Sequence, residues 1–270
     1  MQRHFHKMHG LGNDFVIVDA RPKSSEGPFA VTPPLARAIA DRRTGIGCDQ
    51  LIVIDDSDCA DLRMRIWNPD GGEVESCGNA TRCVVALTGA KTIETSGGVL
   101  SGGAIDGEVE VTLVEPRFGW ADIPLADPMD TKPLPMAWDD LAQPLALNVG
   151  NPHLVFFVAD ADAVPLDTLG PRIETDPAFP ERINVNVAEV TTNGFKLRTW
   201  ERGTGLTLAC GTGACAAAVA AIASKRATSP VRVDMPGGSL TIAWAPGEKI
   251  RMRGQATHVF DGELNLDALA

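Results

Sequence analysis

Two cysteines in this chain each follow a tryptophan by ten residues and precede a glycine and a small polar residue. They are Cys77 in "WNPDGGEVESCGNATRC" and Cys210 in "WERGTGLTLACGTGACA". Polar residues lie before each cysteine and an apolar, helix-forming segment follows it, so each is expected at the start of a helix. There, unpaired backbone N–H groups and the positive end of the helix dipole lower the pKa of a thiol and attract a carboxylate. The pattern therefore predicts a reactive thiol beside an anion-binding site, twice.

A matched pair of thiols suits the inversion of a stereocentre by proton transfer. Inversion needs a base on one face of the carbon and an acid on the other. A thiol with an ordinary pKa near 8.5 is expected to shift towards neutrality at a helix N-terminus, so that one cysteine removes the α-proton and the other returns one. The N–H groups of the two helix starts would stabilise the charge that grows on the substrate carboxylate.

Other roles for the cysteines fit the sequence less well. Cys77 and Cys83, like Cys210 and Cys215, are spaced so that on a helix they point to different faces, which argues against a metal site or a disulfide within either pair. No metal is therefore predicted, and a bridge between Cys77 and Cys210 would be an oxidation artefact. The remaining thiols are expected to be small buried side chains: Cys48, Cys59, Cys83 and Cys215.

Two further functions remain open at this point. The segment "GTGACA", from Gly211 to Ala216, with Asp234 about twenty residues later, imitates a dinucleotide-binding fingerprint and would indicate an oxidoreductase. The equivalent segment "GNATRC" lacks the second glycine, so what repeats is the cysteine and not the glycine pattern. A non-catalytic binding protein is the other alternative, and the presence of both cysteines disfavours it.

Composition limits the class of protein. The chain has 270 residues, of which 44% are hydrophobic, enough for one large or two medium domains. The net charge of −11 disfavours nucleic acid as a partner, and no apolar run approaches the roughly 18 residues that span a bilayer. The first residues lack the apolar core of a secretory leader, so we expect a cytoplasmic location with reduced thiols.

Internal repetition indicates two similar halves. An offset of 133 residues superposes "RMRIW" on "KLRTW" as well as Cys77 on Cys210, and nearby offsets pair "GNDFVIVDA" with "GNPHLVFFVA" and "GGVL" with "GGSL". We expect an N-terminal half over 1–117, to which a strand within 255–270 returns, and a C-terminal half over 118–254. The Pro- and Asp-rich stretch 116–144 is expected to join them, and a pseudo-two-fold axis would bring equivalent elements face to face across a cleft.

Hydrophobic patterns predict an α+β fold. Helices are expected over "TPPLARAIADRRTG", with Thr32 as N-cap, over "GNATRCVVALTGA", and over "GACAAAVAAIASK", which is apolar nearly all round and should be buried. Short β-branched runs predict more strands than helices and mostly antiparallel pairing. These runs are "DFVIVDA", "QLIVID", "LRMRIW", "EVEVTLV", "HLVFFVA", "FKLRTW" and "SLTIAWA".

These motifs together resemble the diaminopimelate epimerase family over nearly the whole chain. The resemblance rests on "KMHGLGNDFVIVDA", "TGIGCDQLIVI", "NPDGGEVESCGNATRC", "GNPHLVFF", "FPERINV", "WERGTGLTLACGTGACA" and "PGGSLTIAW". It implies a cofactor-independent enzyme that interconverts LL- and meso-diaminopimelate for lysine and peptidoglycan synthesis. It also implies two similar pseudo-symmetric domains, each a sheet wrapped around a central helix, and a homodimer.

The resemblance also implies the residues of the site. Cys77 and Cys210 would be the acid and base, and His153 and Glu201 would tune the thiols or the substrate ammonium. Positions that match the family's substrate contacts are Asn13, Gln50, Asn68, Gly78, Asn79, Asn151, Asn184, Glu201, Arg202, Gly211 and Thr212. In this set Gly78, Asn79, Gly211 and Thr212 would hold the α-carboxylate at the helix starts, and Arg202 would bind the distal carboxylate.

Overall fold

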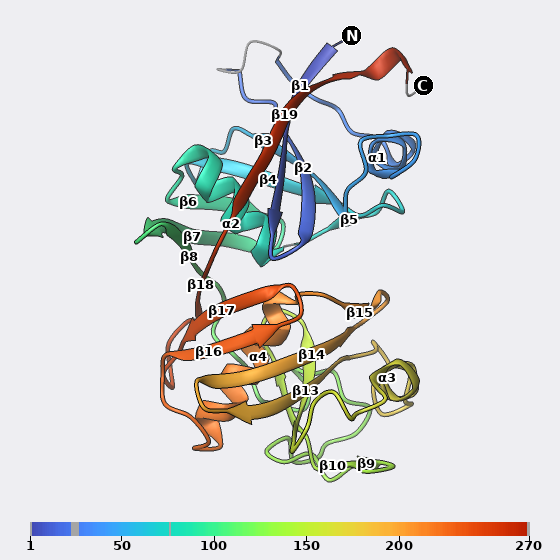
Figure 1. Cartoon of the computed structure of the whole chain (residues 1–270), viewed down its shortest axis with the longest axis vertical. Helices are drawn as coiled ribbons and strands as arrows, with labels where there is room; N and C mark the ends of the chain where they lie inside the picture. Colours follow the sequence, from blue (N-terminus) through green and yellow to red (C-terminus); the bar gives the residue numbers. More distant parts are fainter. Residues whose placement is uncertain (1, 23–26, 76, 269–270) are drawn as a thin grey trace. The chain divides into compact units, whose positions relative to one another are not determined.

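The computed structural model describes residues 2–22, 27–75 and 77–268 (Figure 1). The chain divides into two compact units, the first formed by Met1–Val111 together with Gly254–Ala270 and the second by Thr112–Arg253. Among the helices in the described ranges, none combines the length and the apolar character that crossing a bilayer requires.

The first unit combines a mixed sheet with two helices, which come between strands in the sequence. Its elements are β1 (Gln2–Gly10), β2 (Asn13–Asp19), α1 (Pro33–Ala40), β3 (Gln50–Asp55), β4 (Leu62–Trp67), β5 (Glu73–Val74), α2 (Gly78–Thr88), β6 (Thr92–Thr95), β7 (Gly98–Ile105), β8 (Glu108–Thr112), β19 (Thr257–Asn265) and the 3-10 turn η1 (Leu266–Ala268). Strands β1–β2, β3–β4, β4–β5 and β6–β7 pair antiparallel, whereas β2–β3 and β4–β6 pair parallel.

The second unit repeats this arrangement from β11 onwards and adds a short strand pair, β9–β10, before it. It contains β9 (Ala137–Trp138), β10 (Leu141–Ala142), β11 (Leu145–Asn148), β12 (Pro152–Val158), α3 (Leu166–Glu174), β13 (Asn184–Thr191), β14 (Gly194–Glu201), β15 (Gly205–Thr207), α4 (Gly211–Ala223), β16 (Val231–Met235), β17 (Gly238–Ala243) and β18 (Arg251–Gly254). From β11 onwards the pairings match those of the first unit, including the parallel pairs β12–β13 and β14–β16. The predicted α+β class with two similar halves is confirmed.

The helices that begin at the two cysteines lie inside their units. Helix α4 is buried on nearly every side, because it packs against β11, β12, β13, β14, β16 and β17 of the sheet that wraps around it. Helix α2 packs against β1, β2 and β7 in the same way. Most positions of α4 are alanine, whose small side chain lets the surrounding strands approach the helix backbone closely.

Helix α1 forms where the sequence predicts it. Thr32 is the N-cap, and its side chain accepts a hydrogen bond from the N–H of Leu35. Pro33 occupies the first turn, where its missing N–H costs nothing. Ala36 and Ile39 face the core that α1 shares with β2 and β3.

The stretch 116–144 belongs to the second unit and contributes to its core. Ile123, Leu134 and Trp138 are buried there against β12 and β13. The stretch therefore packs onto β12 and β13 and does not act as a linker. The division between the two units lies at Val111–Thr112.

The last strand returns to the first. β19 pairs antiparallel with β1 over nearly its whole length, so the two ends of the described chain lie side by side in the first unit (Figure 1). Gly262 of β19 lies opposite Phe5, whose ring occupies the space that a side chain at this position would need; a Cβ there would come within 2.6 Å of the ring.

Candidate active site

Cys77 is the N-cap of α2. Its backbone is extended, with φ −146° and ψ 112°, and the first helical hydrogen bond runs from the N–H of Thr81 to the carbonyl of Cys77. The N–H groups before Thr81, at Gly78, Asn79 and Ala80, therefore precede the intrahelical ladder, as at any helix start. The predicted combination of a thiol and a helix N-terminus is thus present in the first unit.

Three of the predicted residues meet at this helix start. The Asn13 Oδ1 atom accepts a hydrogen bond from Asn79 Nδ2 at 3.1 Å, and Cys77 Sγ lies 3.9 Å from the same oxygen. Asn79 Oδ1 in turn accepts from the guanidinium of Arg82 at 2.9 Å. Arg82 is fully buried, so it places a positive charge under the first turn of α2.

Sequence reasoning missed Arg82 as a site residue. An arginine between Thr81 and Cys83, on a helix that is otherwise apolar, was the signal that could have found it, because a buried arginine requires specific partners.

A charged network holds Asn13 from the other side. Asn13 Nδ2 donates to Asp49 at 2.9 Å, and Arg42 bridges Asp49 and Asp14 at 2.8 and 2.6 Å. Burial acts to raise the pKa of the Asp14 carboxyl, but hydrogen bonds from Arg42 and Lys7 outweigh it and lower this pKa to about 2. Asp14 is therefore ionised at neutral pH, and the network fixes the orientation of the Asn13 amide.

Gln50 and Asn68 form a second group in the first unit. Gln50 Nε2 donates to Asn68 Oδ1 at 2.9 Å, while the backbone of Asn68 closes the turn to Gly72. Asn68 is therefore both a turn residue and a side-chain partner. Gln50 Oε1 is buried, and it has no hydrogen-bond partner among the described residues. A buried amide oxygen without a partner is the kind of acceptor that a ligand ammonium would satisfy.

Cys210 is the N-cap of α4, in the position that Cys77 has in α2. Its sulfur accepts a hydrogen bond from the N–H of Gly213 at 3.3 Å and lies 3.5 Å from Thr212 Oγ1. The first helical bond runs from Ala214 to the carbonyl of Cys210. The N–H groups of Gly211 and Thr212 thus precede the intrahelical ladder, as predicted.

The pKa of the Cys210 thiol differs from the sequence-based expectation. Burial raises it well above its usual value, and the nearby carboxylate of Glu201 raises it further; the hydrogen bonds from Thr212 and Gly213 act in the opposite direction but are smaller effects. The expected shift towards neutrality was therefore wrong for Cys210, because burial outweighs the helix N-terminus. The residue is a protonated thiol at neutral pH.

His153 belongs to a buried polar chain beneath α4. Asn186 Nδ2 donates to His153 Nδ1 at 3.0 Å, so the ring proton is on Nε2, which donates to Asn151 Oδ1 at 2.8 Å. Asn186 Oδ1 accepts from Thr199 Oγ1 at 2.9 Å. The chain holds the Asn151 amide in one orientation, which makes His153 a positioning residue for Asn151.

Sequence reasoning missed Asn186 and Thr199. Both are buried, and Asn186 occurs two residues after Asn184 on the same face of β13. A second asparagine on a face that should be apolar was the available signal.

Replacing His153 by glutamine is expected to remove part of the protein's acid sensitivity. Burial lowers the pKa of His153 to about 3 from its ordinary 6.5. Between pH 3 and pH 6.5 the unfolded chain binds a proton at His153 that the folded chain does not bind. The free energy of unfolding is therefore highest above pH 6.5, and it decreases as the pH falls from 6.5 towards 3. From pH 7 to 5 the loss is about 2 kcal/mol.

Urea unfolding of the two proteins at pH 7 and 5 measures this difference. The wild type should lose about 2 kcal/mol more than His153→Gln over this interval. Equal losses in both proteins, or a ring that titrates near pH 6.5 by NMR, would contradict a buried neutral histidine.

Asn184 and Arg202 are linked to each other through the backbone. Asn184 Oδ1 accepts from the N–H of Arg202 at 2.9 Å, and its Nδ2 donates to the carbonyl of Pro152 at 2.8 Å. The amide of Asn184 thus fixes the backbone at Arg202. The side chain of Arg202 is exposed and donates to the carbonyl of Glu181 at 2.9 Å.

None of the six cysteines forms a disulfide. Cys48, Cys83 and Cys215 are buried as predicted, and burial raises the pKa of Cys48 and of Cys83 to about 12, which makes both inert at neutral pH. The prediction for Cys59 was wrong: it is exposed, because it lies in a turn before β4 in which its N–H donates to Ser57 Oγ.

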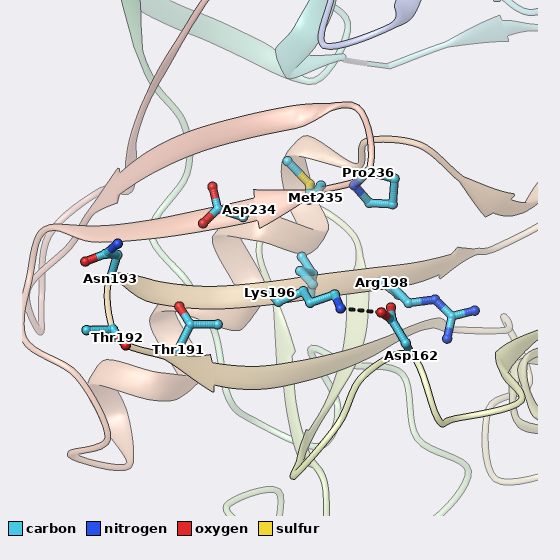
Figure 2. A pocket seen from close by; sticks show the side chains of 10 residues that line it. Asp162, Thr191, Thr192, Asn193, Lys196, Arg198, Asp234, Met235 and Pro236 are labelled. Atoms are coloured by element: carbon cyan, nitrogen blue, oxygen red, sulfur yellow. Dashed lines mark hydrogen bonds and ion pairs between the residues drawn. The ribbon is translucent and has the colours of Figure 1, made fainter.

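The geometry at Asp234 does not match a dinucleotide site. Along β16, the buried Val233 and Met235 alternate with Asp234, which lies on the opposite face of the strand. There it accepts from Arg232 and lines a hollow of about 480 Å³ on the outer side of β13, β14 and β16 (Figure 2). The glycines after Cys210 are buried in α4, on the inner side of the sheet. The two parts of the apparent fingerprint therefore do not face one ligand.

The charged side chains that line the hollow, among the described residues, are engaged in contacts with the protein itself. Lys196 is paired with Asp162 across it, and Arg198 donates to the carbonyls of Ala161 and Val164 (Figure 2). These contacts fasten the segment before α3 to the outer face of β14.

Comparison with known sequences assigns the family. The family model described as "Diaminopimelate epimerase" matches residues 5–114 and 145–259. The chain belongs to the diaminopimelate epimerase family. It is 62% identical over 270 residues to the diaminopimelate epimerase of Rhizorhabdus wittichii, covering 99% of this chain and 97% of that protein, and 63% identical over 265 residues to that of Sphingopyxis alaskensis, covering 97% of each.

Solved structures at low sequence identity share the fold. A hydroxyproline epimerase from Agrobacterium vitis, with bound trans-4-hydroxy-L-proline, matches with a TM-score of 0.68 at 14% identity over 97% of this chain and 91% of that one. A phenazine biosynthesis protein of the PhzF family from Bacillus anthracis matches with a TM-score of 0.67 at 17% identity over 98% and 99%. The duplicated fold is thus common to the diaminopimelate epimerase family and to more distant proteins.

Proposed function

We propose that this protein is an isomerase that interconverts LL- and meso-2,6-diaminopimelate by proton transfer at one α-carbon, without a cofactor. Membership of the diaminopimelate epimerase family supports the substrate. The observation that carries the mechanism is the repeated placement of Cys77 and Cys210, each the N-cap of the central helix of its unit. Lysine and peptidoglycan precursor synthesis use this interconversion.

In the proposed reaction one cysteine acts as thiolate and takes the α-proton, and the other acts as thiol and gives its proton to the opposite face of the carbon. The carbon–hydrogen bond breaks on one side as a new one forms on the other, so the substrate is inverted. The first cysteine is then a thiol and the second a thiolate, and proton exchange with water restores both before the next turnover. In the reverse direction the roles exchange. Burial raises the pKa of Cys210, which supports its role as the acid in the direction in which Cys77 is the base.

The helix starts stabilise the charge that develops during the reaction. When the α-proton leaves, negative charge spreads onto the α-carboxylate, and in this proposal the N–H groups at Gly78, Asn79, Gly211 and Thr212 bind it. A well-placed donor of this kind contributes about 3–4 kcal/mol to the transition state. Glu201 accepts from Thr207 and serves as an anionic partner for the substrate ammonium.

The remaining predicted contacts distinguish the two ends of the substrate. Diaminopimelate carries an ammonium and a carboxylate at each end, so it needs acceptors as well as donors. Gln50 Oε1 is a buried acceptor suited to an ammonium. Arg202 is the proposed partner of the distal carboxylate, and its backbone is held by Asn184. Asn13, Asn68 and Asn151 complete the proposed set.

Incubation of LL-diaminopimelate with the purified protein in D₂O tests this proposal. With no cofactor added, one deuterium should enter at the inverted α-carbon, and meso-diaminopimelate should accumulate until the two isomers equilibrate. L-Proline and trans-4-hydroxy-L-proline serve as control substrates and should not exchange. Inversion that requires an added nicotinamide cofactor would indicate an oxidoreductase, and binding of diaminopimelate without exchange would indicate a binding protein.

We further propose that the protein is a cytoplasmic homodimer that acts on this small molecule and not on nucleic acid or membrane. The family resemblance supports the dimer, and light scattering coupled to size-exclusion chromatography measures it.

A further inference from the structure

A cluster of three histidines and one carboxylate lies on the strand pair β1–β19. His6 of β1 lies opposite Asp261 of β19, and a register shift after Lys7 brings His258 next to them. His4, two residues before His6, lies on the same face of β1. The first and last strands of the first unit thus present three imidazoles and a carboxylate together.

The distances bring these groups close to metal-binding geometry. His6 Nδ1 and His258 Nε2 are 2.6 and 2.7 Å from the same oxygen of Asp261. One ligand atom each from His4, His6 and Asp261 lie within 4.8 Å of one another. Ligand atoms in a tetrahedral zinc site, with bonds of about 2.0–2.1 Å, are about 3.3 Å apart. Rotations of the side chains that bring these atoms from within 4.8 Å to this spacing would place His4, His6 and Asp261 around one ion, and His258 adjoins them through its contact with Asp261.

The surroundings allow these rotations. His4, His258 and Asp261 are exposed, and His6 is partly exposed, so no core packing opposes a change of rotamer. On the opposite face of β1, Phe5 is buried in the core and Lys7 is hydrogen-bonded to Asp14, which keeps the strand backbone fixed. The backbone is thus rigid while the ligating side chains can adjust.

We propose that His4, His6, His258 and Asp261 form a binding site for one divalent transition-metal ion, with zinc as the ion to test. Three imidazole nitrogens and one carboxylate oxygen are a typical zinc ligand set, and imidazole also suits nickel and copper but not magnesium or calcium. The site is separate from the cysteine chemistry and does not depend on the proposed function. The bound ion links two strands that are far apart in the sequence.

Isothermal titration of zinc chloride into the full-length protein, first freed of metal with a chelator, tests the site. We expect saturable binding of one zinc per chain that His6→Ala and Asp261→Asn weaken by more than about tenfold. His9→Ala is the matched control, since it removes a histidine of the same strand that is outside the cluster, and it should leave binding unchanged. Magnesium should not compete.

Two further measurements keep the result unambiguous. Cobalt substitution reports the ligands, because coordination by cysteine would add a sulfur-to-metal absorption band that the proposed site lacks. Thermal unfolding should shift upwards with zinc in the wild type and in His9→Ala but not in Asp261→Asn, whose exposed position makes misfolding no concern. Absence of zinc binding, equal binding by His6→Ala, or a sulfur band at the tight site would overturn the proposal.

Discussion

Replacing either Cys77 or Cys210 by alanine is expected to abolish the inversion of diaminopimelate. Each substitution removes one of the two groups that carry a proton, and general acid–base catalysis of this kind contributes about 10²–10⁴-fold to the rate. The loss should appear in kcat, measured by conversion of LL- to meso-diaminopimelate. Both variants should fold, because cysteine to alanine is a small change in volume.

Isotope exchange separates this mechanism from a single-base alternative. Cys210→Ala keeps Cys77 as the base, so it should wash deuterium into one isomer without inverting it. Cys77→Ala keeps only Cys210, whose pKa is raised by burial, and should exchange the α-proton much more slowly. Cys83→Ala, in the same helix as Cys77, and Cys59→Ala, at an exposed turn, are the matched controls and should keep full inversion. Normal inversion by Cys77→Ala or Cys210→Ala would refute the two-thiol mechanism.

Gly213→Ala is expected to disturb the first turn of α4 beside Cys210. A Cβ at Gly213 would lie 2.7 Å from Asn186 Oδ1 and 2.9 Å from Thr199 Oγ1, and 3.2 Å from the Cβ of Cys210. The methyl group must displace the first turn of α4 or break the Asn186–Thr199 hydrogen bond. Overpacking of this kind costs about 1–3 kcal/mol of stability.

The effect on catalysis should exceed the effect on stability. A shift of about 1 Å in the position of Cys210 is enough to lower kcat by about 10²-fold. Steady-state kinetics and urea unfolding measure the two effects in the same preparation. Gly103→Ala, in β7, is the control, because nothing lies within 4 Å of a Cβ there. If Gly213→Ala were as active as Gly103→Ala, the close packing of α4 on Asn186 would have no role in placing the thiol.

The duplication and the cysteine helices could be predicted because they leave direct signals in the sequence. A motif that recurs at one offset indicates a repeated structural unit, and the run after Cys210 is too apolar to be anything other than a buried helix. The N-cap of α1 was equally readable, since Thr32 and the prolines after it act locally.

Helix α3 was not predicted because its sequence opposes it. Gly170 and Pro171 interrupt "LDTLGPRIE", and both residues disfavour the interior of a helix. Tertiary packing overrides this local preference: Leu166 and Ile173 are buried in the core, and a Cβ at Gly170 would come within 2.4 Å of the Trp200 ring. The glycine is therefore required for contact with Trp200, a reason that no local rule contains.

Strand β1 was missed because its inward-facing residues include cations. Arg3 and Lys7 are buried, where the alternating pattern of a strand calls for apolar side chains. Arg3 donates to the carbonyls of Gly27 and Pro28, and Lys7 is paired with Asp14. Partners that only the folded chain brings together cannot be identified from the sequence, and the same holds for Asn186 with His153 and for the burial that raises the pKa of Cys210.

The pairing of β1 with β19 also sets an order of events on the ribosome. Asp261 is translated 255 residues after His6, the residue it contacts across the two strands. Until then one side of β1 is an open edge, which can recruit strands of other nascent chains. The second unit, by contrast, is continuous from Thr112 to Arg253 and has all its own strands earlier in translation. The domain that is begun first is thus the one that is finished last.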